Sequence, residues 1–174
     1  MTRSMLVVIP GVGGAGTEAF REALGYPSLC LEPEAPPYSF QNVRRLLERT
    51  STPEIVVIAF SAGVVGAVGA LTKGWLQQAG LKVEALIALD GWLVPLVKSF
   101  PVYRLSHDRF THQTSRPLGM GTTNFWADPQ VPHRFLWSSP GAVKGWQVTG
   151  KTQVATTALD FLQDRLRAHG APLD

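Results

Sequence analysis

A serine between two small residues, at the end of a hydrophobic run, is the part of the sequence best suited to chemistry. Ser61 follows the run Ile55 to Phe60, and Ala59 and Gly63 stand two residues before and two residues after it. A sharp turn from a strand into a helix needs small residues at these two positions, because larger side chains would collide with the neighbouring backbone. The pattern predicts a nucleophile elbow that holds the Ser61 hydroxyl above the edge of a sheet.

A serine hydroxyl becomes a good nucleophile when an imidazole accepts its proton, so the histidines are the next candidates. The chain has four of them: His107, His112, His133 and His169. We expect His133 to lie on the opposite rim of the sheet, because it precedes an expected strand, and His169 to be solvated near the end of the last helix. The base is therefore His107 or His112. We favour His112, because a loop histidine has more freedom to reach across to Ser61.

The imidazole in turn needs a carboxylate that holds it in the right tautomer, and two aspartates are in position. Asp90 follows the strand expected beside the serine strand, and Asp108 is next to His107. The favoured set is Ser61, His112 and Asp90, while His107 and Asp108 stay open as alternatives. His107, Asp108 and His112 also offer imidazole and carboxylate ligands for a metal, but no second cluster completes such a site and we expect none.

These side chains require a scaffold in which several strands end at one edge. Hydrophobic runs of strand length alternate with segments of helical period, which predicts an α/β fold: a three-layer sandwich around a mostly parallel sheet of about six strands. The expected strands are Met5–Ile9, Ser28–Leu31, Glu54–Phe60, Val83–Leu89, Val102–Leu105 and Arg134–Trp137. The expected helices cover residues 17–24, 39–49, 61–79 and 152–167.

On the strength of Ala59-Phe60-Ser61-Ala62-Gly63 and the order of expected elements, the chain resembles the α/β-hydrolase family, in a small form without a cap domain. The resemblance implies lipase-like or esterase-like chemistry on a serine. It also implies a histidine after the last strand, and the segment 138–149, where we expect that loop, contains none. Alanine at position 59 replaces the glycine usual in the family.

The amide of Ala62, at the start of the helix after Ser61, is placed to stabilise a developing oxyanion. By the resemblance, Pro10-Gly11-Val12-Gly13 corresponds to the loop after the family's oxyanion-hole strand. An amide of Val12 or Gly13 would then face the same anion, and Gly11 would let the backbone approach the substrate closely.

The same glycines allow a rival interpretation. Gly11, Gly13 and Gly16 match the dinucleotide-binding pattern G-x-G-x-x-G, and Glu32 stands where a ribose-binding acid is expected. Two observations count against it: Pro10 interrupts the junction between strand and glycines, and the pattern gives no role to the strand-turn-helix signal at Ser61.

The composition indicates a single folded domain over residues 1–174. Hydrophobic residues make up 45% and charged residues 17%, which excludes a disordered chain. The net charge of +3 is spread along the sequence, so nucleic acid is not an expected partner. No apolar run approaches the ~20 residues of a membrane span. The single cysteine, Cys30, allows no internal disulfide, and a cytoplasmic location fits best.

Residues 108–132 form the longest stretch without a clear period, and we expect a long loop there that acts as a partial lid. Trp92, close to Asp90, is expected to form one wall of a substrate pocket. The sequence as a whole predicts a serine hydrolase or acyltransferase that acts on a small-molecule ester or thioester without a cofactor. The main alternative is a non-catalytic binding protein of the same fold, and the lesser one is a dinucleotide-binding protein.

Overall fold

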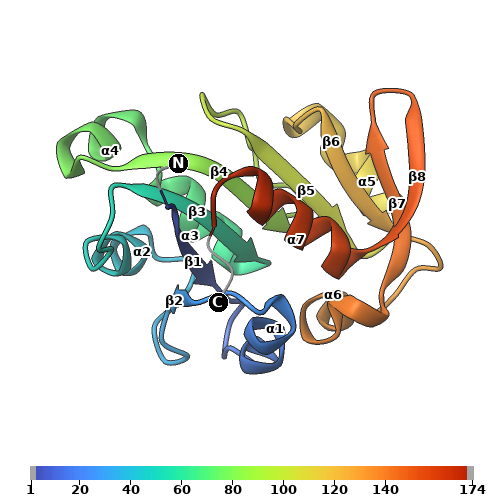
Figure 1. The fold of residues 1–174 in the computed structure, drawn as a ribbon, viewed down its shortest axis with the longest axis horizontal. Coiled ribbons are helices and arrows are strands. Elements are labelled where there is room, and N and C mark those ends of the chain that lie inside the picture. The colour runs from blue at the N-terminus through green and yellow to red at the C-terminus, as the bar shows by residue number, and fades with distance from the viewer. Residues whose placement is uncertain (1–2, 172–174) are drawn as a thin grey trace.

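One mixed sheet runs through the computed structural model, which describes residues 3–171 (Figure 1). Its strands follow the order β2-β1-β3-β4-β5-β6-β7-β8. The first six are parallel to one another, whereas β7 and β8 each run antiparallel to the preceding strand. The strands are β1 (Met5–Ile9), β2 (Ser28–Cys30), β3 (Glu54–Phe60), β4 (Lys82–Leu89), β5 (Val102–Ser106), β6 (Thr123–Ala127), β7 (Lys144–Thr149) and β8 (Thr152–Thr157).

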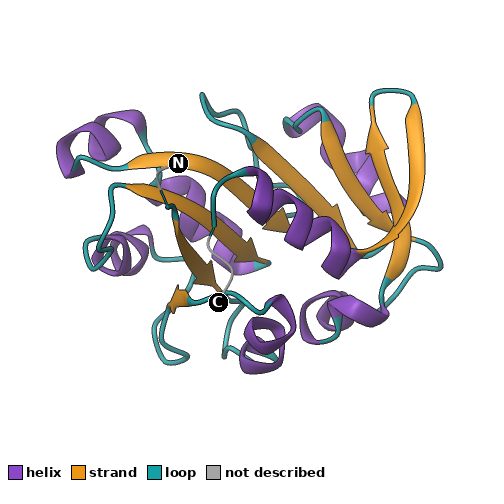
Figure 2. Cartoon of the chain, in the orientation of Figure 1, coloured by secondary structure: helices purple, strands orange, loops and turns teal. Residues whose placement is uncertain are grey.

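Helices cover both faces of this sheet, and Figure 2 shows α7 crossing one of them. The helices are α1 (Thr17–Leu24), α2 (Phe40–Leu47), α3 (Ala62–Ala70), α4 (Lys73–Ala79), α5 (Arg109–Ser115), α6 (His133–Ser138) and α7 (Ala158–Ala168). Two short 3-10 turns follow α5 and α6: Arg116–Leu118 and Pro140–Ala142. The expectation of an α/β fold with a mostly parallel sheet is confirmed, with eight strands in place of about six.

The apolar core lies in two layers because successive strand residues point to opposite faces. Leu6 and Val8 of β1 belong to the cluster that also contains buried residues of α1, α6 and α7. Val7 and Ile9 of the same strand belong to the cluster formed with α2 and α3. A strand that is buried on both faces reads as the unbroken hydrophobic run seen in the sequence.

Three expected elements are wrong in type, and a fourth differs in extent. Residues 134–137 are part of α6 and not a strand, and their adjacent buried residues, Leu136 and Trp137, do not alternate as strand residues would. Residues 108–132 are not one long loop, because they contain α5 and the fully buried strand β6. The expected helix 152–167 begins as β8, which is mostly exposed and follows the turn at Gly150.

The expected helix 61–79 is divided at Leu71 into α3 and α4.

The two ends of the described chain lie side by side: the Ser4 amide donates to the Gly170 carbonyl at 3.0 Å, and the Ser4 hydroxyl donates to the His169 carbonyl at 2.9 Å. None of the helices in residues 3–171 combines the length and the apolar character needed to span a bilayer.

Candidate active site

Ser61 occupies the turn between β3 and α3 in a strained backbone conformation. Its φ is 53° and its ψ is −121°, in a region that residues with a side chain rarely adopt. The Ser61 amide donates to the Leu89 carbonyl at 2.9 Å, which ties the turn to the end of β4. A Cβ atom at Gly63 would lie 2.4 Å from the Pro10 carbonyl oxygen, so α3 is packed directly on the end of β1. The small residue that the sequence places at position 63 is a steric requirement.

His133 is the histidine whose imidazole lies next to Ser61. Its Nε2 lies 3.1 Å from Ser61 Oγ, within hydrogen-bond reach. His133 is the first residue of α6, and its ring stacks on Phe60 with a centroid separation of 4.7 Å. Phe60 stacks in turn on Trp137, which is buried one turn further along α6. Aromatic packing therefore fixes the ring that faces Ser61.

Asp90 holds the other nitrogen of the His133 ring. The His133 Nδ1 is 2.7 Å from Asp90 Oδ2, and the Asp90 side chain is 2% exposed. Asp90 follows β4 with a φ of 49°, and its amide donates to the Leu105 carbonyl at 2.8 Å. Ser61, His133 and Asp90 thus form one hydrogen-bonded chain, in which the serine precedes the aspartate and the aspartate precedes the histidine along the sequence.

A second imidazole shares the same carboxylate. His107 Nδ1 is 2.9 Å from Asp90 Oδ2, and the His107 amide donates to Asp90 Oδ1 at 2.9 Å. Burial raises the pKa of Asp90, but the hydrogen bonds from His107 and His133 outweigh it, and the net pKa lies below the ordinary value. The hydrogen bond to Asp90 raises the pKa of His107 despite its partial burial. The carboxylate is therefore ionised at neutral pH.

The structure corrects the expected position of two histidines. His112 is not at Ser61: its ring faces Trp126 with a centroid separation of 6.4 Å and lines a different hollow. Burial, followed by the charges of Arg116 and Arg109, lowers the pKa of His112 to about 4. His133 does not lie on the opposite rim, because β6 is the last parallel strand and His133 follows its carboxyl end.

The signal that would have placed His133 correctly is the segment Thr123-Asn124-Phe125-Trp126-Ala127. It is rich in residues of high β-propensity, and Asp128-Pro129 directly after it marks the end of the strand.

Asp108 is near the site but bonded elsewhere: its Oδ1 accepts from the Thr111 amide at 2.7 Å and caps α5. Its Oδ2 lies 3.4 Å from His107 Nε2.

The glycine loop lies next to the serine. A Cβ at Gly11 would be 3.5 Å from the Ser61 Cβ and 3.1 Å from the Phe60 ring, so glycine permits the close approach of this backbone. Val12 is exposed, and Gly13 has a φ of 78°. On the other side of the serine, Ala62 is the first residue of α3, and amides in the first turn of a helix lack intrahelical acceptors.

A pocket of about 400 Å³ opens beside Ser61. Its walls come from α3, α5, α6 and the loop after β4, and its lining residues are Ser61, Ala62, Val65, Asp90, Trp92, Val94, His107, Thr111 and His133. Trp92 is half exposed and donates from Nε1 to Thr114 Oγ1 at 3.1 Å. Trp92 forms one wall of this pocket, and the exposed ring of Phe110 lies near it with a centroid separation of 6.4 Å.

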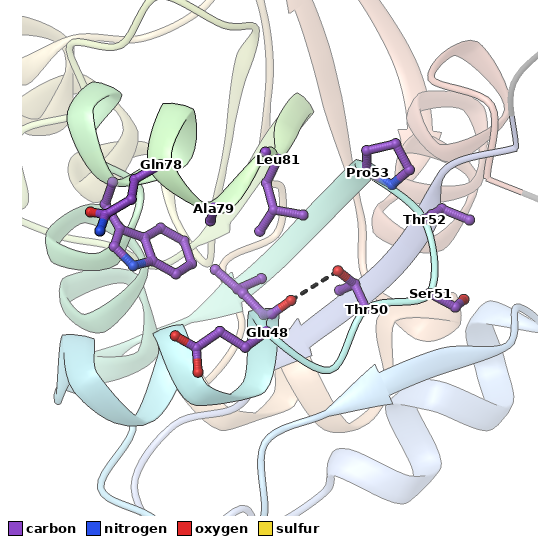
Figure 3. A pocket seen from close by; sticks show the side chains of 11 residues that line it. Glu48, Thr50, Ser51, Thr52, Pro53, Gln78, Ala79 and Leu81 are labelled. Carbon is purple, nitrogen blue, oxygen red and sulfur yellow. Dashed lines mark hydrogen bonds between the residues drawn. The ribbon is translucent and has the colours of Figure 1, made fainter.

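A larger hollow of about 650 Å³ lies at the other end of β3 and is shown in Figure 3. It is bordered by the end of α2, the end of α4 and the segment 50–53, and Glu48 and Gln78 are among its polar lining residues. The Thr50 hydroxyl donates to the Leu47 carbonyl at 2.8 Å. No histidine or cysteine is among the residues that line it.

Asp90, His107 and His133 each present a metal-ligand atom within 4.8 Å of the others. Two ligand atoms on a tetrahedral zinc at about 2.0–2.1 Å would be about 3.3 Å apart. The two Nδ1 atoms are closer than that to Asp90 Oδ2, at 2.7 and 2.9 Å. These are hydrogen-bond distances, and we interpret the cluster as a hydrogen-bonded network.

Comparison with protein-family models and with curated proteins finds no match to this chain. The case for a function therefore depends on the geometry of the site.

Proposed function

We propose that the protein is a serine hydrolase of the α/β-hydrolase type, with Ser61 as nucleophile, His133 as general base and Asp90 as orienting acid. The observation that carries the proposal is the unbroken chain from Ser61 Oγ through His133 to Asp90, with distances of 3.1 and 2.7 Å. A serine on a strained strand-to-helix turn, with this chain order of acid and base, is the arrangement that such hydrolases use.

In the first half of the reaction, His133 Nε2 takes the Ser61 proton as Oγ attacks the carbonyl carbon of an ester or thioester. His133 then gives this proton to the leaving alcohol or thiol, and the acyl group stays on Ser61. In the second half, water loses a proton to the same nitrogen, attacks the acyl carbon and releases the acid, and the proton returns to Ser61. Asp90 stays ionised and stabilises the imidazolium in both halves.

The Ala62 amide supports one side of an oxyanion hole, since it stands at the amino end of α3 directly after the nucleophile. The loop with Val12 and Gly13, which lies against Ser61 at Gly11, supports the other side. No lysine or arginine lines the pocket beside Ser61, and its only carboxylate is already bonded to two imidazoles. These walls favour an uncharged substrate with an apolar acyl group.

The contacts of the glycine loop count against the dinucleotide alternative. A pyrophosphate would need the free amino end of α1, but a Cβ at Gly16 would meet the Ser138 Cβ at 2.9 Å. Trp137 from the same helix also donates to Thr17 Oγ1 at 3.3 Å. Helix α6 therefore packs against the amino end of α1.

Labelling with a fluorophosphonate, which reacts with activated serines, tests the proposal. We expect one label per chain on the wild type, none on Ser61→Ala, and strongly slowed labelling on His133→Gln, because the base is lost. Ser51→Ala is the matched control, because Ser51 is an exposed serine at the opposite end of β3. This variant should label like the wild type.

Absence of labelling and of ester or thioester hydrolysis in the folded wild type would overturn the proposal. It would favour the alternative of a non-catalytic binding protein. Labelling that persists in Ser61→Ala would assign the reactivity to another residue.

A further inference from the structure

Asp90 Oδ2 accepts from two imidazoles, and the proposed triad accounts for only one of them. His133 Nδ1 approaches this oxygen at 2.7 Å and His107 Nδ1 at 2.9 Å. The second carboxylate oxygen, Oδ1, accepts from the His107 amide at 2.9 Å. Both oxygens of the acid are thus bonded to the backbone or the side chain of one residue at the end of β5.

The hydrogen-bond pattern fixes the protonation of both rings. A carboxylate only accepts, so each Nδ1 must carry a proton. His133 is then left with a bare Nε2 toward Ser61 when it is neutral, which is the form that a general base needs. The Nε2 of His107 faces Asp108 Oδ2 at 3.4 Å, so that ring lies between two carboxylates and its charged form is favoured.

Three titratable side chains among the described residues face His107 from the surrounding elements: Asp90 after β4, Asp108 at the start of α5, and His133 of α6, whose ring centroid is 5.9 Å away. The remaining positive charge on this part of α5, Arg109, lies over the ring of Trp126. The Val131 amide donates to the His107 carbonyl at 3.1 Å and holds the backbone in place.

We propose that His107 is a positioning residue, which clamps the Asp90 carboxylate for His133. Its backbone amide and its ring each donate to Asp90, one to each carboxylate oxygen. The clamp keeps the acid ionised and oriented although its side chain is buried.

Two substitutions test the clamp. In His107→Asn, the amide nitrogen takes nearly the place of Nδ1 and can still donate to Asp90. In His107→Leu, this side-chain donor is lost. His169→Gln is the control, because it removes a histidine that is bonded to Tyr103 and lies outside this network.

For the kinetic arm, which depends on the proposed hydrolase activity, we measure kcat and KM against pH with a neutral ester. We expect His107→Asn to keep kcat closer to the wild type than His107→Leu does, because asparagine can still donate a hydrogen bond to Asp90. We expect kcat of His107→Leu to fall at least about tenfold at its optimum, with KM within about twofold, because Asp90 is no longer fixed. His169→Gln should match the wild type.

A merely structural role would lower the amount of folded enzyme without lowering kcat per active site, so active-site titration is included to normalise kcat. If both His107 variants show the wild-type kcat, the proposal is wrong.

A second arm does not need activity. In NMR spectra of isotope-labelled histidine, recorded on Ser61→Ala protein, we expect His107 to titrate above the ordinary range, and the added change Asp90→Asn to lower its titration midpoint. An unchanged midpoint would overturn the role of His107 even if the enzyme proves inactive. Conversely, a failed labelling experiment with an intact His107 titration would overturn the hydrolase proposal alone.

Discussion

Three residues with side chains adopt a positive φ within residues 3–171, and two of them, Ser61 and Asp90, belong to the candidate site. The three are Ser61 at 53°, Asp90 at 49° and Leu93 at 62°. Each such conformation costs about 1–3 kcal/mol and persists only where its surroundings enforce it. The strained residues Ser61 and Asp90 lie at the carboxyl ends of β3 and β4, where their side chains bond to the same imidazole, that of His133.

His112 makes stability depend on pH although it is outside the site. Its Nδ1 is buried with no hydrogen-bond partner in the described chain, and its pKa is about 4 against an ordinary 6.5. The unfolded chain therefore binds more protons than the folded one between these values, so stability falls as pH drops from 6.5 toward 4. We expect this residue to remove about 2 kcal/mol of stability over that window.

Urea unfolding at pH 7, 5.5 and 4.5 measures this effect by comparing the wild type with His112→Phe. The variant should lose less stability toward acid than the wild type, because it has no proton to gain. Parallel curves for the two proteins would show that His112 does not contribute.

Residue types alone were enough to select Ser61 and Asp90, since steric demands and strand ends are visible in the sequence. They were not enough to select His133, because its place depends on whether the residues before it form a strand. His107 was visible as a candidate, but its bond to Asp90 depends on the parallel pairing of β4 with β5, which brings their carboxyl ends together.

At the scale of the elements, the packing of α3 on β1 is testable with a pair of glycines. A Cβ at Gly63 would overlap the Pro10 and Ile9 carbonyl oxygens, at 2.4 and 2.8 Å, whereas a Cβ at Gly74 in α4 has no neighbour within 4 Å. We expect Gly63→Ala to lower the free energy of unfolding by about 2–4 kcal/mol and to impair labelling of Ser61. Gly74→Ala should raise stability by up to about 1 kcal/mol, because alanine favours helix. Thermal unfolding and labelling rates of both variants would reveal whether α3 tolerates the methyl group.

The loop after β4 is held by a buried arginine. Arg104 of β5 donates to the carbonyls of Gly91, Val94, Leu118 and Gly119, at distances from 2.6 to 3.4 Å. Burial lowers the pKa of Arg104 to about 10, so it stays charged at neutral pH. The guanidinium thus fixes the loop that carries Asp90 and Trp92 to the segment after α5.

Arg104→Met should lower the free energy of unfolding by about 2–4 kcal/mol, because it leaves these carbonyls without donors. Activity should fall as the loop loosens. The control is Arg45→Met, which removes an exposed arginine that contacts Asn42 on α2 and should change stability by less than about 0.5 kcal/mol. Equal urea midpoints for the two variants would contradict the role of Arg104.

At the scale of the whole molecule, the walls of the pocket bear on substrate choice. Val65 and Trp92 are exposed apolar side chains in the lining of this pocket, and the exposed ring of Phe110 lies near Trp92. We expect hydrolysis of neutral esters to improve as the acyl group grows from acetyl to hexanoyl. Trp92→Ala should raise KM for the longer ester about tenfold, because about 1–2 kcal/mol of apolar contact is lost, and should change KM for the acetate little.

Val154→Ala, which trims an exposed side chain on β8, is the control for Trp92→Ala. KM measured over the acyl series gives the result. Equal KM changes for short and long esters would show that Trp92 does not contact the acyl group.

Strands β1, β3 and β4 could be predicted because strands buried on both faces leave long hydrophobic runs. The parallel strand β6 and the antiparallel strands β7 and β8 could not. The residues of β8 are mostly exposed, so they carry no apolar alternation, and Thr157 passes directly into α7 as its N-cap. Because β8 was not predicted, β6 was not identified as the last parallel strand.

The contact of Ser4 with His169 and Gly170 makes the chain suitable for circular permutation. A short linker could join these neighbouring positions, and new termini could then open at Gly150 and Lys151, in the turn between β7 and β8. That turn lies beside the amino end of β6, away from Ser61. A circularly permuted protein with this cut would keep serine, histidine and aspartate in their present order on one uninterrupted stretch of chain.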